Sequence, residues 1–383
     1  MEKIKGFKNT WVLCENGIRK TNLIIEDGII TYIGDKEIEG LVELEDDKII
    51  LPGFIDQHIH GANGVDVIDG TEDDIYSMAC SLAKEGVTAF LATTTTQSVE
   101  VIDKSLETIK SYMDKNHEDG SEVIGVHLEG PFLSDKYKGA QLADYLIKPS
   151  VEMFKHFEEK SGGTIKLVTI AVEEEGTDEL VEYLNSKNIV STIGHSAAGY
   201  EDMKKAVNNG VRCVTHTYNG MRPLRRDDIG TVGSALLFDE LYCELICDGV
   251  HSSAPAVKLL WKNKPTDKLI LVSDALRTKF MPDGKYYELE QVIVLKGKEA
   301  RLEDGRLAGS VLSLNDAIVN LMNFTGADFI SAVKCVTENP AKNLNLFNEM
   351  GSIKENKLAN LVIVDKELNV YQTIRKGNVI YKK

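Results

Sequence analysis

The chain has 383 residues, of which 43% are hydrophobic, and a formal net charge of -16 at pH 7. This length suits a large α/β domain with a small companion domain. The acidic balance argues against nucleic acid or an anionic membrane as a partner. No signal sequence, no apolar run of membrane-spanning length and no zinc-finger spacing among the six cysteines is found. We therefore expect a cytoplasmic protein with reduced, packed thiols.

Both ends of the chain have the pattern of short β-strands. Residues 1–50 contain β-type runs at 11–13, 22–25 and 29–33, separated by turn pairs such as Asn16-Gly17 and Asp27-Gly28. Such pairs are typical of β-hairpins. Residues 346–383 repeat the pattern. We predict a small β-sandwich domain assembled from these two terminal segments.

Between the termini, residues 51–345 alternate between strand and helix patterns. The expected strands cover 49–59, 88–94, 123–129, 166–171, 190–195, 213–218, 242–247 and 269–273. Helical periodicity appears between them, for example at 73–84, 99–114, 177–187 and 200–208. Eight apolar strands alternating with helices predict a (β/α)8 TIM-type barrel as the catalytic domain. A doubly wound open sheet also alternates, but no Gly-rich fingerprint opens the first helix.

The first expected barrel strand carries Asp56, His58 and His60 at alternate positions. On a strand these residues share one face, and paired imidazoles are good ligands for a divalent metal. Alone, the pattern is weak, and surface histidines of a hairpin or edge strand are the alternative. The metal hypothesis therefore depends on further ligands downstream.

Those ligands fall at the carboxyl ends of the expected strands, where barrel enzymes build their active sites. Six of the 8 histidines lie there: His58, His60, His127, His195, His216 and His251. Glu129 and Asp274 also follow strands. His127 sits one step deeper than Glu129 and fits either a core histidine or a partner of a ligand. His117 and His156 are expected at the surface.

Several segments carry a family resemblance. They are His127-Leu-Glu-Gly-Pro-Phe, Lys138-Gly-Ala-Gln141, Gly194-His-Ser, Thr215-His-Thr-Tyr-Asn-Gly, Asp248-Gly-Val-His251, Ser273-Asp-Ala and Leu307-Ala-Gly-Ser. In order and spacing they resemble the amidohydrolase superfamily and, within it, the N-acetylglucosamine-6-phosphate deacetylase family. The resemblance runs from about residue 10 to the C-terminus.

The resemblance implies a role for each matching residue. Glu129, His195 and His216 match the ligands of one metal, His58 and His60 match those of a second, and Asp274 matches the catalytic acid/base. The implied substrate contacts are Ala140, Gln141, Asn219, Gly220, His251, Leu307, Ala308 and Gly309. The cofactor would be two divalent ions per chain, and such mixed sites accept zinc, iron, cobalt or manganese.

Two positions depart from the family pattern. Gln141 stands where many relatives have His. In the loop 221–230, Asp227 takes the place of the usual phosphate-binding Arg, so Arg226 or Arg225 would have to bind the phosphate. In the family this loop reaches the active site of a neighbouring subunit, which implies a homodimer.

The implied reaction is removal of the acetyl group from N-acetyl-D-glucosamine 6-phosphate, giving D-glucosamine 6-phosphate and acetate. A bound divalent ion lowers the pKa of water to roughly 7. Asp274 would move the proton, and the metal or a neutral His251 would stabilise the oxyanion.

Three other readings stay open. The substrate could be another N-acetyl sugar phosphate, such as N-acetylgalactosamine 6-phosphate. A cyclic amide or nucleobase is a second alternative; members of that branch often use a modified lysine after strand 4, whereas Lys166 lies at the opposite end of that strand. A non-enzymatic scaffold would predict gaps among the ligands, and there are none.

Overall fold

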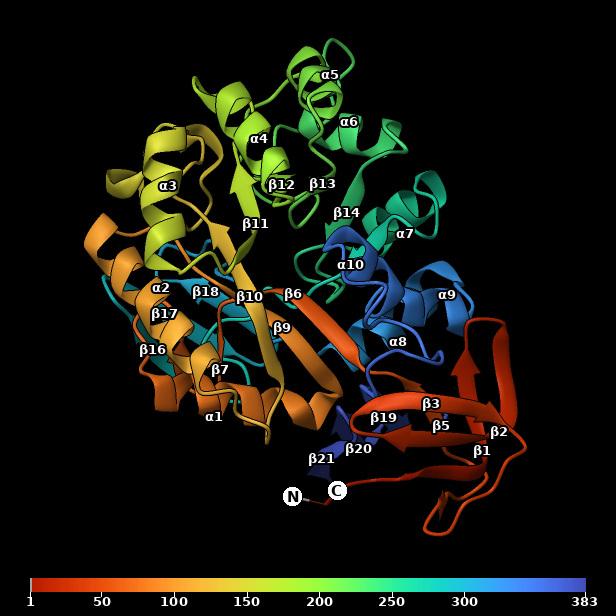
Figure 1. Cartoon of the computed structure of the whole chain (residues 1–383). Helices are drawn as coiled ribbons and strands as arrows, with labels where there is room; N and C mark the ends of the chain where they lie inside the picture. The colour runs from red at the N-terminus through yellow and green to blue at the C-terminus, as the bar shows by residue number, and fades with distance from the viewer. Residues whose placement is uncertain (1) are drawn as a thin grey trace.

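The computed structural model describes residues 2–383, and a barrel of parallel strands occupies its centre (Figure 1). The strand order is β15-β14-β13-β12-β11-β10-β9-β6. The bounds are β6 (Phe54–Ile59), β9 (Val87–Thr93), β10 (Glu122–Glu129), β11 (Ile165–Ile170), β12 (Val190–Ile193), β13 (Cys213–Val214), β14 (Tyr242–Leu245) and β15 (Leu269–Leu271). Just beyond β15, Asp274 N donates to His58 O at 2.9 Å and His60 N donates to Ala275 O at 2.9 Å. These bonds join the last strand to the first.

Helices surround this barrel, and local sequence signals define their ends. They are α1 (Glu72–Leu82), α2 (Val99–Asp114), α3 (Val151–Lys160), α4 (Thr177–Ser186), α5 (Tyr200–Asn208), α6 (Gly230–Leu237), α7 (Ala254–Asn263), α8 (Leu314–Thr325), α9 (Phe329–Lys334) and α10 (Glu338–Asn343). In α2, Ser98 accepts a hydrogen bond from Val101 N as the N-cap, and Ile102, Leu106 and Ile109 form the buried face. A cap followed by apolar residues at helical spacing makes such a helix predictable.

The two ends of the chain form a second sheet, in which red N-terminal and blue C-terminal strands lie side by side (Figure 1). Its strands are β1 (Gly6–Cys14), β2 (Gly17–Glu26), β3 (Ile29–Gly34), β4 (Val42–Glu43), β5 (Ile49–Pro52), β19 (Leu361–Val364), β20 (Val370–Arg375) and β21 (Asn378–Lys382). Antiparallel pairing of β5 with β19 joins the two halves. The predicted fold, a barrel with a small β domain from both termini, is confirmed. The domain boundaries at 50/51 and 345/346 stay predictions.

The expected strand 49–59 is two strands in the structure. β5 ends at Pro52 in the terminal sheet, and β6 begins at Phe54 in the barrel. Gly53 lies between them, its N–H donating to Asn360 O at 2.8 Å. A Cβ at Gly53 would meet the Thr88 side chain at 2.3 Å, so only glycine fits this crossing point.

A three-stranded antiparallel sheet between β15 and α8 was not predicted from the sequence. It consists of β16 (Gly284–Glu288), β17 (Gln291–Lys296) and β18 (Glu299–Leu302). Its buried side chains, Ile293 and Leu295 among them, pack in a cluster of their own with Leu276 and Ala308. Gln291 Nε2 donates to Ala140 O at 2.8 Å, which ties this insert to the loop after β10.

Small elements complete the chain. They are β7 (Gly61–Ala62), β8 (Val65–Asp66) and the 3-10 helices η1 (Ala83–Glu85), η2 (Asp135–Tyr137) and η3 (Ala143–Tyr145). Across residues 2–383 no helix has both the length and the apolar character that a membrane crossing needs. All six cysteines are thiols and five are buried, which confirms the expected packed thiols.

Candidate active site

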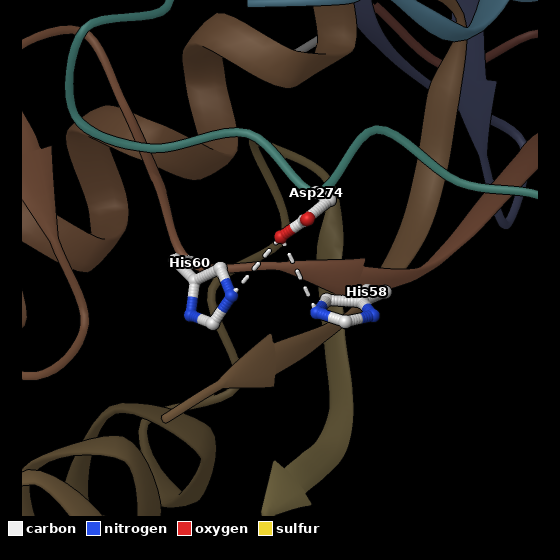
Figure 2. A group of neighbouring side chains, drawn as sticks. All are labelled: His58, His60 and Asp274. Atoms are coloured by element: carbon white, nitrogen blue, oxygen red, sulfur yellow. Dashed lines mark ion pairs between the residues drawn. The ribbon is translucent and has the colours of Figure 1, made fainter. Parts of the chain in front are cut away.

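Two groups of possible metal ligands lie at the carboxyl end of the barrel. One triad consists of His58, His60 and Asp274, and we call it the β6 triad; its ligand atoms lie within 4.8 Å of one another. In Figure 2 both imidazoles turn toward the Asp274 carboxylate, whose Oδ1 is 3.2 Å from His60 Nε2 and 3.4 Å from His58 Nε2. The other triad, called the Glu129 triad, consists of Glu129, His195 and His216. The structure thus gathers all six predicted metal and catalytic residues.

The Glu129 carboxylate lies between the two triads. Its Oε1 is 3.1 Å from His216 Nε2, 3.4 Å from His195 Nε2 and 3.5 Å from His58 Nε2. Its Oε2 is 3.3 Å from His60 Nε2. The two groups therefore form one continuous centre, which the Glu129 carboxylate connects.

The charges of this centre are strongly coupled because its members are buried together. Burial disfavours a charge on His60, but Asp274 and Glu129 outweigh it and raise the pKa of His60 to about 10. Burial also opposes ionisation of Asp274, but His58 and His60 outweigh it and lower the pKa of that carboxyl to about 2. The buried carboxylates are thus stabilised by nearby positive charge, which a divalent ion can supply in place of the imidazolium protons.

The orientation of the imidazoles fits a metal. Nδ1 of His60 faces Thr93 O at 3.2 Å, and Nδ1 of His195 faces Tyr137 O at 3.0 Å. A carbonyl oxygen only accepts, so each ring donates from Nδ1 and turns the Nε2 lone pair toward the centre. His58 Nε2 is buried without a hydrogen-bond partner in residues 2–383. Imidazoles that are tied through Nδ1, as in His60 and His195, and whose Nε2 atoms lie beside carboxylates are typical ligands of a divalent metal site.

Three residues of the centre have left-handed backbone conformations. The φ angles are 45° at His195, 27° at His216 and 47° at Asp274. Such non-glycine conformations cost of order 1–3 kcal/mol each and cluster at functional sites. Here they occur just after β12, β13 and β15, where the chain leaves the barrel wall.

A cavity of about 410 Å³ opens above the centre. Its lining includes every residue of the two triads except His58. Eight of the ten predicted substrate contacts also line it: Ala140, Gln141, Asn219, Gly220, His251, Leu307, Ala308 and Gly309. The other two, Arg225 and Arg226, lie outside this lining.

Gln141 contacts a metal-ligand candidate as well as the cavity. Its Oε1 accepts from Thr96 N and Thr95 Oγ1, both at 2.8 Å, and its Nε2 donates to Glu129 Oε2 at 2.9 Å. Because the Thr96 N–H can only donate, this network fixes the orientation of the amide. Gln141 therefore holds Glu129 in place, a role that the sequence did not predict.

The geometry of His251 bears on its predicted role. Its Nδ1 is 2.7 Å from Asp248 Oδ2, and its backbone N–H donates to Asp248 Oδ1 at 2.7 Å. Burial opposes ionisation of Asp248, but the hydrogen bonds from His251 and from Val250 N outweigh it and lower the pKa of the Asp248 carboxyl. The carboxylate of Asp248 is therefore the acceptor in its bond with His251 Nδ1. A neutral His251 then carries its proton on Nδ1 and offers Nε2 to the cavity as an acceptor. In that state Nε2 suits a substrate hydroxyl, and the expected oxyanion contact stays a prediction.

The arginines of the loop 221–230 are largely paired with acidic neighbours. Arg222 lies 2.8 Å from Asp228, and Arg225 Nε lies 3.7 Å from Asp227. Arg226 is exposed and lines a second cavity beside the start of α5. Two arginines that the sequence reasoning missed, Arg301 and Arg306, line the main cavity from the insert.

Asp56 and His127 support the centre without joining it. The β6–β9 register shifts between Asp56 and Ile59, and Asp56 Oδ1 accepts from His58 N and Ser273 N, both at 3.3 Å. The expectation that its carboxylate accompanies the two imidazoles is therefore wrong. The His127 ring packs edge-on against His58, with ring centroids 4.5 Å apart, and its Nε2 lies 2.7 Å from Thr169 Oγ1. Burial lowers the pKa of His127 well below its usual value, so the ring is neutral.

The site and the barrel agree with comparisons to known proteins. Residues 49–380 match the model of the Amidohydrolase family, and the chain belongs to this family. N-acetylglucosamine-6-phosphate deacetylase of Bacillus subtilis (strain 168) is 36% identical over 385 residues, which cover 98% of this chain and 96% of the relative. N-acetylgalactosamine-6-phosphate deacetylase of Escherichia coli O157:H7 is 32% identical over 357 residues, covering 93% and 94%. A crystal structure of N-acetylglucosamine-6-phosphate deacetylase from Thermotoga maritima has a TM-score of 0.90 and 34% identity, covering 99% of this chain and 100% of that one.

Proposed function

We propose that this chain is a metal-dependent hydrolase that removes the acetyl group from N-acetyl-D-glucosamine 6-phosphate, giving D-glucosamine 6-phosphate and acetate. The observation that carries the proposal is the complete set of ligands with Asp274, all of which except His58 line the main cavity. The cavity of about 410 Å³ has the size of a small-molecule site. The named activities of the two relatives support the same chemistry.

The residues of the centre would have different roles in amide hydrolysis. The Glu129 triad would hold one ion and the β6 triad a second, which together supply a water of lowered pKa and positive charge opposite the amide oxygen. Asp274 contacts both imidazoles through Oδ1, which leaves Oδ2 to move a proton. With a pKa of about 2, Asp274 is ionised at neutral pH and can accept a proton from the attacking water. It then passes that proton to the leaving amine nitrogen.

The cavity walls would bind and orient the sugar. Nε2 of His251 accepts from a hydroxyl, and the strand-end segments with Asn219 and Gly309 provide further polar groups. The insert is tied to the loop after β10, since Arg306 donates to Gly139 O and Tyr145 Oη donates to Glu290 at 2.6 Å, and we expect it to limit access of water from that side. Exclusion of water strengthens electrostatic interactions within the site.

The identity of the sugar is tested by acetate release from a matched panel. The panel consists of N-acetylglucosamine and N-acetylgalactosamine, each with and without a 6-phosphate. We expect the highest kcat/KM for N-acetylglucosamine 6-phosphate. A preference for the galactosamine compound, the activity named for the Escherichia coli relative, would change the assigned substrate and keep the reaction.

We further propose that the protein is a homodimer in which the loop 221–230 reaches the partner's active site and Arg226 binds the phosphate. Three observations support this arrangement. Arg226 lies outside the lining of its own main cavity. It makes no ion pair within residues 2–383, unlike Arg222 and Arg225. Leu224 and Leu237 nearby are 54% and 58% exposed, which is typical of apolar side chains that a partner covers.

Arg226→Ala tests this assignment, with Arg225→Ala and Arg306→Ala as matched controls. A hydrogen bond to a charged group is worth roughly 1.5–3 kcal/mol. We expect Arg226→Ala to lower kcat/KM about 10- to 100-fold for the phosphorylated sugar and to leave activity on the free sugar unchanged. If Arg306→Ala has this effect instead, the insert binds the phosphate within the same chain. A monomer by light scattering would reject the dimer.

We also propose a cytoplasmic location, supported by the six thiols. Fractionation of the producing cells, with detection of the chain in each fraction, tests it.

A further inference from the structure

Glu244 on β14 is a buried carboxylate that the proposed mechanism does not use. It is 0% exposed, and both of its oxygens are engaged. Oε1 accepts from Gln57 Nε2 at 2.6 Å. Oε2 lies 3.0 Å from His58 Nδ1 and accepts from His216 N at 3.2 Å. One carboxylate therefore contacts a residue of each triad from the side away from the cavity.

This contact crosses the interior of the barrel. β14 and β6 are not neighbours, because β15 lies between them in the closed ring. Successive residues of a regular strand point to opposite faces. Here the register shift between Asp56 and Ile59 lets Gln57 and His58 reach the same carboxylate. Gln57 Oε1 in turn accepts from Asn343 Nδ2 of α10 at 3.1 Å, so the chain of bonds continues to a helix packed on β6 and β15.

His58 differs in this respect from the other imidazoles of the centre. His60 and His195 donate from Nδ1 to the backbone carbonyls of Thr93 and Tyr137. The carboxylate partner of His58 is the stronger acceptor, because it carries a full negative charge. A carboxylate behind a ligating histidine holds the ring orientation and tautomer and makes the metal-facing nitrogen a better ligand.

We propose that Glu244 is a positioning residue that sets the affinity of the β6 triad for its metal ion. It donates no ligand itself. It would present His58 Nε2 to the ion. This buried nitrogen makes no hydrogen bond within residues 2–383 and faces Asp274 Oδ1 at 3.4 Å and Glu129 Oε1 at 3.5 Å. This inference rests on the proposed second ion at the β6 triad.

The test is Glu244→Gln, measured as ion content during titration with a chelator of known affinity, using Zn²⁺ as the probe. Loss of a carboxylate behind a ligand typically weakens metal binding 10- to 100-fold. We expect the affinity to fall by this factor for the ion that is released first and to stay unchanged for the more tightly bound ion. The new amide keeps the size of the side chain, and Gln57 and Asn343 can reverse their amides to satisfy it. The variant should therefore fold.

Glu85→Gln is the matched control for loss of a buried carboxylate. Glu85 is 4% exposed and pairs with Lys279 at 2.6 Å, and neither residue belongs to a triad. This variant should lower thermal stability and leave both ion affinities at the wild-type values. Glu244→Asp keeps the charge but moves the carboxylate back by one methylene, so it should lower the affinity for the same ion. This variant replaces Glu244→Gln if Glu244→Gln does not fold.

The outcomes separate this inference from the proposed two-ion centre. A wild-type protein that holds a single ion at saturating Zn²⁺ would reject the second ion, and the inference with it. A wild-type protein with two ions whose affinities are unchanged in both Glu244 variants would overturn the inference alone. Equal weakening of both ions, or the same effect in Glu85→Gln, would show a general structural role.

Discussion

The two triads have similar distances but different origins in the chain. In the β6 triad, His58 and His60 lie two residues apart at the end of one strand, and Asp274 follows the strand that closes the barrel beside it. In the Glu129 triad, the residues follow three strands, β10, β12 and β13. The shortest contact between an imidazole and a carboxylate is 3.2 Å from His60 to Asp274 in the β6 triad and 3.1 Å from His216 to Glu129 in the Glu129 triad.

Their supports differ more than their distances. The β6 triad has a buried carboxylate behind the ring of His58. The Glu129 triad is held by the Gln141 amide and the Tyr137 carbonyl, and Glu244 contacts it only through the backbone N–H of His216. Residues with the same ligand chemistry can therefore bind with different strength, because the groups behind the ligands differ. The following predictions test whether Asp274 of the β6 triad acts in proton transfer while its two histidines bind an ion.

The largest effect is expected for Asp274→Asn, the residue of the β6 triad assigned to proton transfer. The amide cannot accept the proton of the attacking water, so kcat should fall roughly 10²- to 10⁴-fold. Initial rates of acetate release measure the loss, and ion content confirms that the centre is still loaded. Turnover close to that of the wild type would remove Asp274 from the mechanism.

The next prediction compares the two triads by the ion content and activity of one double variant in each. The double variant His58→Asn, His60→Asn should lower the ion content from two per chain toward one and leave reduced but measurable activity. The matched double variant His195→Asn, His216→Asn should lose more activity than the first double variant, because in the proposed mechanism the Glu129 triad would hold the ion that the reaction needs. Equal activities of the two double variants would contradict this division.

A smaller loss is expected for Gln141→Ala, which removes the amide that holds Glu129. A hydrogen bond to a charged group is worth roughly 1.5–3 kcal/mol, and we expect the low end, about tenfold in kcat/KM, because Gln141 is half-buried. Thr95→Val is the control, since it removes one bond to the amide and leaves that to Glu129. An unchanged kcat/KM in Gln141→Ala would show that Glu129 needs no such support.

The smallest effect concerns the pH dependence of the metal-free protein. The folded-state pKa of His60 is raised from 6.5 to about 10, so its stabilising effect is full below pH 6.5 and is lost as the pH rises toward 10. For Asp274, lowered from 3.8 to about 2, the effect is present above pH 3.8 and is lost as the pH falls toward 2. Tm of the chelator-treated protein should therefore fall by roughly 2–4 °C per kcal/mol lost on the alkaline side. His60→Asn should show less of this decline, and a decline as steep as that of the wild type would exclude His60 as its cause.

Local patterns were sufficient for much of the molecule. The helices α2 and α5 match their predicted bounds, because caps and helical spacing lie within the segments themselves. The barrel followed from the alternation of strands and helices, and its closure explains why residues at the ends of separate strands meet. The ligands were found for the same reason, and their roles remain predictions. The insert was missed because its strands, of 4 to 6 residues, are short and its buried side chains pack in a small cluster apart from the main core.

What the sequence by itself determined is the barrel, the small β domain and the residues that the strand ends bring together, since each follows from periodicity and position. The tertiary structure alone decided the groups behind those residues. Glu244 lies 186 positions from His58, and Gln141 reaches Glu129 through a loop held by Thr95 and Thr96. The Asp56 carboxylate accepts from the backbone N–H groups of His58 and Ser273 and belongs to neither triad. Such contacts depend on the closure and register of the whole barrel, which no local pattern of residues contains.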